Sequence, residues 1–307
     1  MRPIVIEAID GAYTFEDEYT YYILSSNASL TGTTDNRIAF NGTLNGILMA
    51  GDVTYTVAAT NYVEVDGGAR ASGLIAVVAE HSAISNLHVS VDSVTNYSFS
   101  SGVGSNGFIT GQNNGVIFNS SVTGQGITLS GNSRGILVGR NNGLISYSYS
   151  NIEVVRTAVP YLGGITYINQ GKILSCYFTG YINNTDDTSG TTTRTGMSAG
   201  IIGNILTRAY GTDGSYVYNC YMAGVIEDIS TSNSFANGTF TSLDSGSNNF
   251  IDSLANNESG NISYIDEDGS VTVVTCVSTA DLMSANVLEG EWHTSTVPYE
   301  LNLETGT

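Results

Sequence analysis

The chain has 307 residues, of which 41% are hydrophobic and only 12% charged, and its net charge is −19. So acidic a protein repels phosphate backbones, which excludes nucleic-acid binding. No stretch reaches the ~18 apolar residues that a membrane helix needs, so we expect no membrane insertion.

The N-terminal residues 1–37 are expected to form a docking segment that leads into the rest of the fold. Their start, MRPIVIEAIDGAYTFEDE, lacks the basic flank and long apolar core of a signal peptide. We therefore expect that a signal has been removed or that the protein reaches its site by another route, such as assembly into a virus particle. Strands are predicted at residues 16–24, 40–47 and 54–65.

An internal repeat follows. Three segments align without gaps at a period of 28 residues: Gly107–Gly124, Gly135–Ile152 and Gly163–Gly180. Looser copies are Ser72–Val91 before them and, after an insertion, Ala199–Asn204 with Gly214–Ile226. Five copies of one unit indicate a repeat architecture.

Each copy reads as short strands separated by glycine or Asn-Gly turns, which rules out a helical repeat. A short strand cannot bury its apolar face alone, so equivalent strands of successive copies should stack. The crossover rule favours a right-handed coil. The sequence therefore predicts an all-β right-handed parallel β-helix, or β-solenoid, over residues 38–228, with N-terminal strands before it and a C-terminal cap over residues 229–307.

Stacking predicts columns of matching side chains. An inward aliphatic column should contain Ile84, Ile117, Ile145, Ile173 and Val217. A corner column, where left-handed backbone and amide ladders are expected, should contain Asn113, Asn141 and Asn169. Cys176 and Cys220 share a further inward column, and two buried thiols are a better expectation than a disulfide between parallel neighbours.

The neighbouring column should point outward, and it is the one predicted binding feature. It contains His88, Tyr149, Tyr177 and Tyr221. Exposed aromatic faces suit sugar rings or another subunit, whereas the plainer interpretation is that tyrosine favours strands.

In the expected cap, residues 261–274 predict a hairpin around Asp-Gly, and residues 278–290 predict a short helix. Asp266–Ser270 hints at a calcium loop, but the glutamate that an EF-hand needs at its twelfth position is missing.

The recurring G-G-I-x-G-x-N-x-G-x-I-x-N-C-Y pattern, carried by Gly163–Tyr177, Gly107–Ser120 and Gly214–Tyr221, resembles the GLUG-type repeat of large bacterial surface proteins. FNGTLNG at residues 40–46 and STADLM at 278–283 resemble the segments that open and close such arrays. The resemblance implies a β-helical stalk or adhesin-like module without catalytic residues.

Catalytic signals are weak. The match to GxGxxG at Gly102–Gly107 has no predicted helix after it, and no GxSxG, HExxH or P-loop occurs. Histidines 81, 88 and 293 have no metal-ligand spacing, so no metal or cofactor is expected. Glycan cleavage needs paired carboxyls, and the few acids of the repeats do not recur in one column: Glu80, Asp92, Glu153, Asp186, Asp187, Glu227 and Asp228.

These observations predict a non-enzymatic structural or attachment protein on an external surface, with a virus particle (fibre, spike or capsid decoration) favoured over a bacterial cell. A secreted bacterial adhesin domain is the alternative, and a polysaccharide-degrading tailspike is a weaker one. The expected partners are further copies of the chain, in a trimer for example, other surface or capsid proteins, and host glycans.

Overall fold

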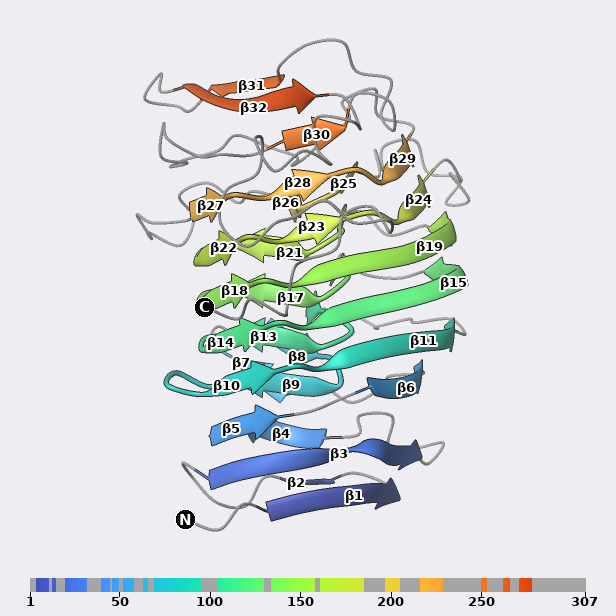
Figure 1. The fold of residues 1–307 in the computed structure, drawn as a ribbon, viewed down its shortest axis with the longest axis vertical. Helices are drawn as coiled ribbons and strands as arrows, with labels where there is room; N and C mark the ends of the chain where they lie inside the picture. Colours follow the sequence, from blue (N-terminus) through green and yellow to red (C-terminus); the bar gives the residue numbers. More distant parts are fainter. Residues whose placement is uncertain are drawn as a thin grey trace.

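The computed structural model describes residues 4–10, 13–14, 20–31, 40–44, 46–49, 52–57, 63–65, 69–94, 104–129, 134–157, 161–184, 197–204, 216–228, 250–252, 262–265 and 271–277. Over these residues the protein is all-β, with parallel strands gathered in four open sheets and no helix. The strands lie one above another along the long axis of the molecule (Figure 1). No helix that could cross a membrane is found in the described part of the chain.

The four sheets are numbered in the order in which the chain visits them within one sequence repeat. Sheet 1 has six strands: β7 (Val63–Val65), β8 (Ala69–Ser72), β12 (Gly104–Asn106), β16 (Arg134–Gly135), β20 (Tyr161–Gly163) and β25 (Met197–Ala199). Sheet 2 has seven: β2 (Tyr13–Thr14), β4 (Phe40–Leu44), β9 (Ile75–Val78), β13 (Thr110–Asn113), β17 (Val138–Asn141), β21 (Thr166–Asn169) and β26 (Ile202–Asn204).

Sheet 3 has eight strands: β1 (Ile4–Asp10), β3 (Thr20–Thr31), β5 (Gly46–Met49), β10 (Ala83–Ser85), β14 (Val116–Phe118), β18 (Leu144–Ser146), β22 (Lys172–Leu174) and β27 (Tyr216–Tyr218). Sheet 4 has eleven: β6 (Asp52–Val57), β11 (His88–Val94), β15 (Ser121–Leu129), β19 (Tyr149–Thr157), β23 (Tyr177–Phe178), β24 (Tyr181–Asn184), β28 (Tyr221–Met222), β29 (Val225–Asp228), β30 (Phe250–Asp252), β31 (Ile262–Ile265) and β32 (Val271–Val277).

The chain passes through the sheets in a fixed order. From β12 it enters sheet 2 at β13, sheet 3 at β14 and sheet 4 at β15, and it then returns to sheet 1 at β16. We call one such passage a rung. The next rung repeats the order, and its strands pair in parallel with those of the rung before. The sequence repeat and the structural repeat are therefore the same unit.

The aliphatic column lies in register along sheet 3. Ile84 pairs with Ile117, Ile117 with Ile145, Ile145 with Ile173, and Ile173 with Val217. All five side chains are fully buried. The same column continues toward the N-terminus through Leu48 and Tyr22, which the sequence repeat does not include. Each buried aliphatic side chain contributes roughly 1.5–3 kcal/mol, so this column is a main source of stability.

The sheets run past both boundaries expected from the sequence. Strands β1 and β3, within residues 1–37, belong to the same sheet as the repeats. At the other end β30 and β32 extend sheet 4 beyond residue 228, again with parallel pairing.

Two of the pairs formed by the described strands are antiparallel. β31 pairs with β32, as the predicted hairpin requires. β7 pairs with β8, which the sequence does not predict. The helix expected at 278–290 and the Asp266–Ser270 loop lie outside the described residues.

Candidate binding groove

The Asn113 column forms a buried amide ladder at the turn between sheets 2 and 3. The amide nitrogen of Asn113 donates to the side-chain oxygen of Asn141 over 2.8 Å, and Asn141 donates to Asn169 over 2.8 Å. The Asn113 oxygen also accepts the backbone N–H of Gly115 at 3.2 Å. Stacking and side-chain bonding thus satisfy these amides where water cannot reach them.

The expectation of left-handed backbone in that column is wrong. Positive φ angles recur instead one turn later, before sheet 4, at Asn86, Asn119, Tyr147, Ser175 and Asn219. In the turn between sheets 2 and 3, His81 has a positive φ, in the rung that carries Val78 in place of the asparagine. The reason is that Asn113 closes its corner through its side chain, as an Asx turn does, so its own backbone need not become left-handed. The second bend lacks that bond and reverses the chain through the backbone itself.

A ladder of hydroxyls and thiols follows the second bend. Ser120, Ser148, Cys176 and Cys220 are buried, and each donates to the carbonyl oxygen two residues earlier, over 2.8–2.9 Å for the serines and 3.3 Å for the cysteines. Cys176 N–H donates to the Cys220 sulfur at 3.4 Å, and both cysteines are free thiols. Burial raises the pKa of the Cys176 thiol well above its ordinary value, and the adjacent Cys220 thiol adds to the shift. Cys176 is therefore an inert thiol that packs like its serine counterparts.

The tyrosine column does not offer the exposed faces expected of it. The rings of Tyr149 and Tyr177 stack with centroids 4.7 Å apart, and those of Tyr177 and Tyr221 stack at 5.0 Å. Tyr177 is only 4% exposed and Tyr221 is 0% exposed. His88, half-buried, shares a 2.9 Å hydrogen bond between Nδ1 and the Ser121 hydroxyl. Each ring covers the face of the next, so the column stabilises the fold, and only Tyr149 and His88, both half-buried, keep part of their surface accessible.

The described residues instead contain a groove on sheet 4, with a volume of about 860 Å³. It crosses β11, β15 and β19 and then the breaks between β23 and β24 and between β28 and β29. Neighbouring strands lie ~4.8 Å apart, so five of them give the groove a length of about 19 Å.

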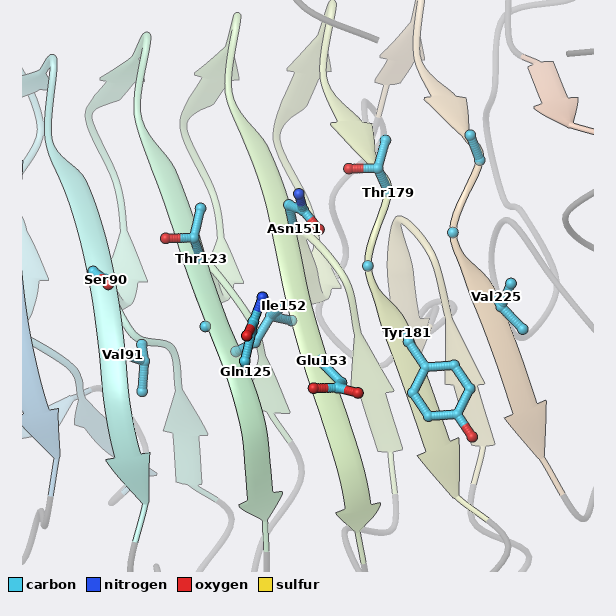
Figure 2. A pocket seen from close by; sticks show the side chains of 14 residues that line it. Ser90, Val91, Thr123, Gln125, Asn151, Ile152, Glu153, Thr179, Tyr181 and Val225 are labelled. Carbon is cyan, nitrogen blue, oxygen red and sulfur yellow. The ribbon is translucent and has the colours of Figure 1, made fainter. Parts of the chain in front are cut away.

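Two rows of side chains line the groove, one on each side of its floor (Figure 2). The first row contains Ser90, Thr123, Asn151 and Thr179. The second row contains Gln125, Glu153, Tyr181 and Val225. Register pairing aligns Ser90 with Thr123 and Asn151, and Glu153 with Tyr181 and Val225. On a strand such as β19 the two groove residues are two positions apart, so their side chains point to the same face. Pairing between neighbouring strands then extends each position into a row.

The floor follows the positions of Val91, Gly124, Ile152, Gly180 and Gly224, which pair or align from strand to strand. The side chains of Val91 and Ile152 are buried in the hydrophobic core, so the floor itself is mainly backbone. A Cβ on Gly180 would overlap the carbonyl oxygen of Ile152, and one on Gly224 would overlap that of Gly180. The added atom would also meet the ring of Phe178 in the core, so a larger residue at either position would disturb the packing beneath the groove.

Glu153 is the only charged side chain among the residues that line the groove. β15 shifts register against β19 between Gly124 and Ile127, and Gly126 adopts a φ of 66° within that bulge. The backbone N–H of Gly126 then donates to Glu153 Oε2 at 3.0 Å. The bulge therefore fixes one carboxylate at the second row.

No cluster of three or more metal-ligating side chains is found in the parts of the chain that the structure describes. His81 is exposed on the turn before β10, and His293 lies outside the described residues. Among the acids noted in the repeats, Glu153 alone lines the groove.

Sequence reasoning missed this groove. Its one recurrent signal is a glycine four residues after Ser120, Cys176 and Cys220, at Gly124, Gly180 and Gly224. The two remaining rungs carry Val91 and Ile152 there, so the position does not stand out as a column.

Comparison of the chain with family models, with curated proteins and with solved structures found no match.

Proposed function

We propose that the chain coils as a right-handed parallel β-helix and acts as a non-enzymatic structural or attachment protein on an external surface, on a virus particle rather than a bacterial cell. The cyclic order of the four sheets and the parallel pairing of successive rungs support the coil. A right-handed path is the usual one for parallel crossovers.

The observation that carries the structural role is the use of repeated side chains inside the fold. The aliphatic column, the amide ladder and the hydroxyl and thiol ladder are all engaged with the rungs above and below. Continuous ladders of this kind make a stiff body, because bending it would break many equivalent contacts together. A stiff acidic body suits presentation at a distance from a surface.

The groove supports binding rather than cleavage. A two-carboxyl glycosidase needs two acids ~5–10 Å apart, whereas the groove lining contains Glu153 alone. The resemblance to GLUG-type repeats also favours a display module.

Electron microscopy with gold-labelled antibody tests this role. Antibody raised against the purified chain should label the outside of virus particles from the source culture. Labelling of the bacterial envelope would favour the adhesin alternative. Labelling confined to the cell interior, or release of oligosaccharide from host capsule, would overturn the proposal.

Self-association is part of the proposal. β1 is the end strand of sheet 3 and pairs with β3 alone among the described strands. Its residues Ile4 and Val5 are 36% and 54% exposed. Unpaired edges with apolar side chains favour pairing with another chain. Native mass spectrometry should give a homo-oligomer, with a trimer the form expected, and Val5→Lys should shift the mass toward the monomer. A monomeric mass for the unmodified chain would contradict self-association.

A further inference from the structure

We infer that the groove across sheet 4 binds a linear, uncharged polysaccharide. This inference rests on the proposed attachment role, and it names the site and the chemical class of the ligand. It goes beyond that role because it places the site away from the expected aromatic column, in which the stacked rings of Tyr177 and Tyr221 are buried.

The form of the groove selects a polymer. It is open along five strands and about 19 Å long, a shape that suits an extended chain better than a compact molecule. Its first row presents one polar group after another at the strand spacing, so a chain with a regular repeat of its own can meet several of them in succession. Binding should therefore strengthen with chain length until the groove is full.

The lining chemistry selects hydroxyl-rich partners. Thr123, Asn151 and Gln125 offer hydroxyl and amide groups that can both donate and accept hydrogen bonds. The half-buried ring of Tyr181 and the exposed side chain of Val225 offer contacts for the less polar faces of sugar rings. A site for a flat apolar ligand would not carry this density of polar groups.

The charge of the groove and of the whole protein disfavours acidic polysaccharides. The groove has one carboxylate and no basic side chain in its lining, and the whole protein carries −19. Uronate, sulfate or phosphate groups would find no cation there and would be repelled over a range of about 10 Å at ordinary ionic strength. Uncharged glycans avoid that repulsion.

An extended peptide is disfavoured by the backbone. Peptides that add to sheets use free N–H and C=O groups at an edge. Across the groove those groups are already paired between rungs, for example Thr179 N–H to Ser150 O at 3.0 Å and Val225 N–H to Gly180 O at 2.9 Å. The groove lies on a sheet face, where side chains alone are available.

The test titrates the full chain by isothermal calorimetry with cello-, manno- and malto-oligosaccharides, from disaccharides to octasaccharides. Oligogalacturonates of matched length serve as acidic probes. At least one neutral series should bind with affinity that rises with length, and the acidic series should bind at least about tenfold more weakly. Failure of every neutral series, or equal binding of the acidic one, would overturn the inference.

Variants locate the site. Asn151→Trp, from an exposed position in the middle of the first row, should block the groove and weaken binding by about tenfold or more. Asn142→Trp is the matched control, because Asn142 is also exposed but does not line the groove. Tyr181→Ala is a second groove variant that adds no bulk and should also weaken binding. Unchanged binding by both groove variants, with circular dichroism showing them folded, would overturn the assignment.

Glu153→Gln separates glycan binding from charge recognition. Neutral oligosaccharides should bind this variant within about twofold of the unmodified chain, because the amide keeps the acceptor oxygen. If polylysine binds the unmodified chain, fails to bind Glu153→Gln, and no glycan binds, the groove recognises basic peptides instead.

The two proposals fail separately. Surface labelling without any neutral glycan binding would overturn the groove assignment and leave the attachment role standing. Glycan binding at the groove without surface labelling would overturn the attachment role alone.

Discussion

Two amide ladders run side by side through the central rungs, one on the inner and one on the outer side of the chain. Asn113 donates to Asn141 in the buried ladder, and Asn142 donates to Asn114 in the exposed one. Residue type, sequence spacing and bond length are the same, at 28 residues and 2.8 Å. The two pairs differ in access to water and in their further bonds, since the buried amides also bond to backbone groups such as Gly115 N–H.

The length of a hydrogen bond therefore does not by itself set its contribution to stability. An exposed amide that loses its partner turns to water, whereas a buried one is left unsatisfied at about 1–3 kcal/mol. Inside, the rungs above and below determine which residue fits, so residue types recur along a column. On the outer surface, contact with solvent or a ligand determines which residue type is favoured. The residue types in the groove rows accordingly vary from rung to rung.

The largest difference in free energy of unfolding between a buried and an exposed substitution is expected for two adjacent residues of β22. Ile173 is fully buried, whereas Lys172 beside it is exposed. Ile173→Ala should lower the free energy of unfolding by about 2–5 kcal/mol, since it removes apolar contacts and leaves a cavity. Lys172→Ala should change it by less than about 0.5 kcal/mol. Urea unfolding followed by circular dichroism measures both, and comparable losses would mean that the column is not the core.

The next largest difference in free energy of unfolding is expected between substitutions in the buried and the exposed amide ladder. Asn141→Leu removes the acceptor of Asn113 and the donor to Asn169, so it should lower the free energy of unfolding by about 2–3 kcal/mol. Asn142→Leu breaks the exposed bond and should stay within about 0.5 kcal/mol of the unmodified chain. The same unfolding measurement applies. Equal losses of unfolding free energy for the two substitutions would contradict the claim that exclusion of water makes the buried amide bonds important.

The smallest effect concerns Cys176, and it depends on pH. Because burial raises the pKa of the native thiol, stability is fully present below the unfolded pKa near ~8.5 and declines as the pH rises toward the folded value. Between about pH 7 and pH 9.5 the unmodified chain should therefore lose about 1 kcal/mol more than Cys176→Ser. At neutral pH the two should differ little, because Ser148 holds the same position one rung earlier. An identical pH dependence of both chains in urea titrations would contradict this.

The inner columns could be predicted because repetition exposes them. Ile117, Ile145 and Ile173 recur at a fixed period, and parallel pairing then brings them into register. The amide ladder and the buried thiols follow from the same period. The period identifies the residues that share a column. For a fully buried position, the neighbours in that column make up most of the side chain's surroundings.

The tyrosine column shows where this reasoning stops. Alternation along the strand places Tyr177 and Tyr221 on the side opposite the core, yet both are buried. Alternation gives the direction of a side chain, whereas burial depends on everything that later packs against it. The same limit explains the misplaced left-handed residues, because only the hydrogen bond from Gly115 reveals how the Asn113 corner closes.

The amino-acid sequence alone determined the repeating unit, its strands and the identity of the residues that stack inside, because chemical likeness at a constant spacing does not depend on how the strands are joined. The tertiary structure alone decided where a ligand could lie. The groove combines a bulge before Ile127 with side chains from five strands whose types do not repeat, above a floor in which only the glycines recur. A recurring glycine does not by itself reveal a groove, because the hollow depends on how the bulge and the strands are placed in space.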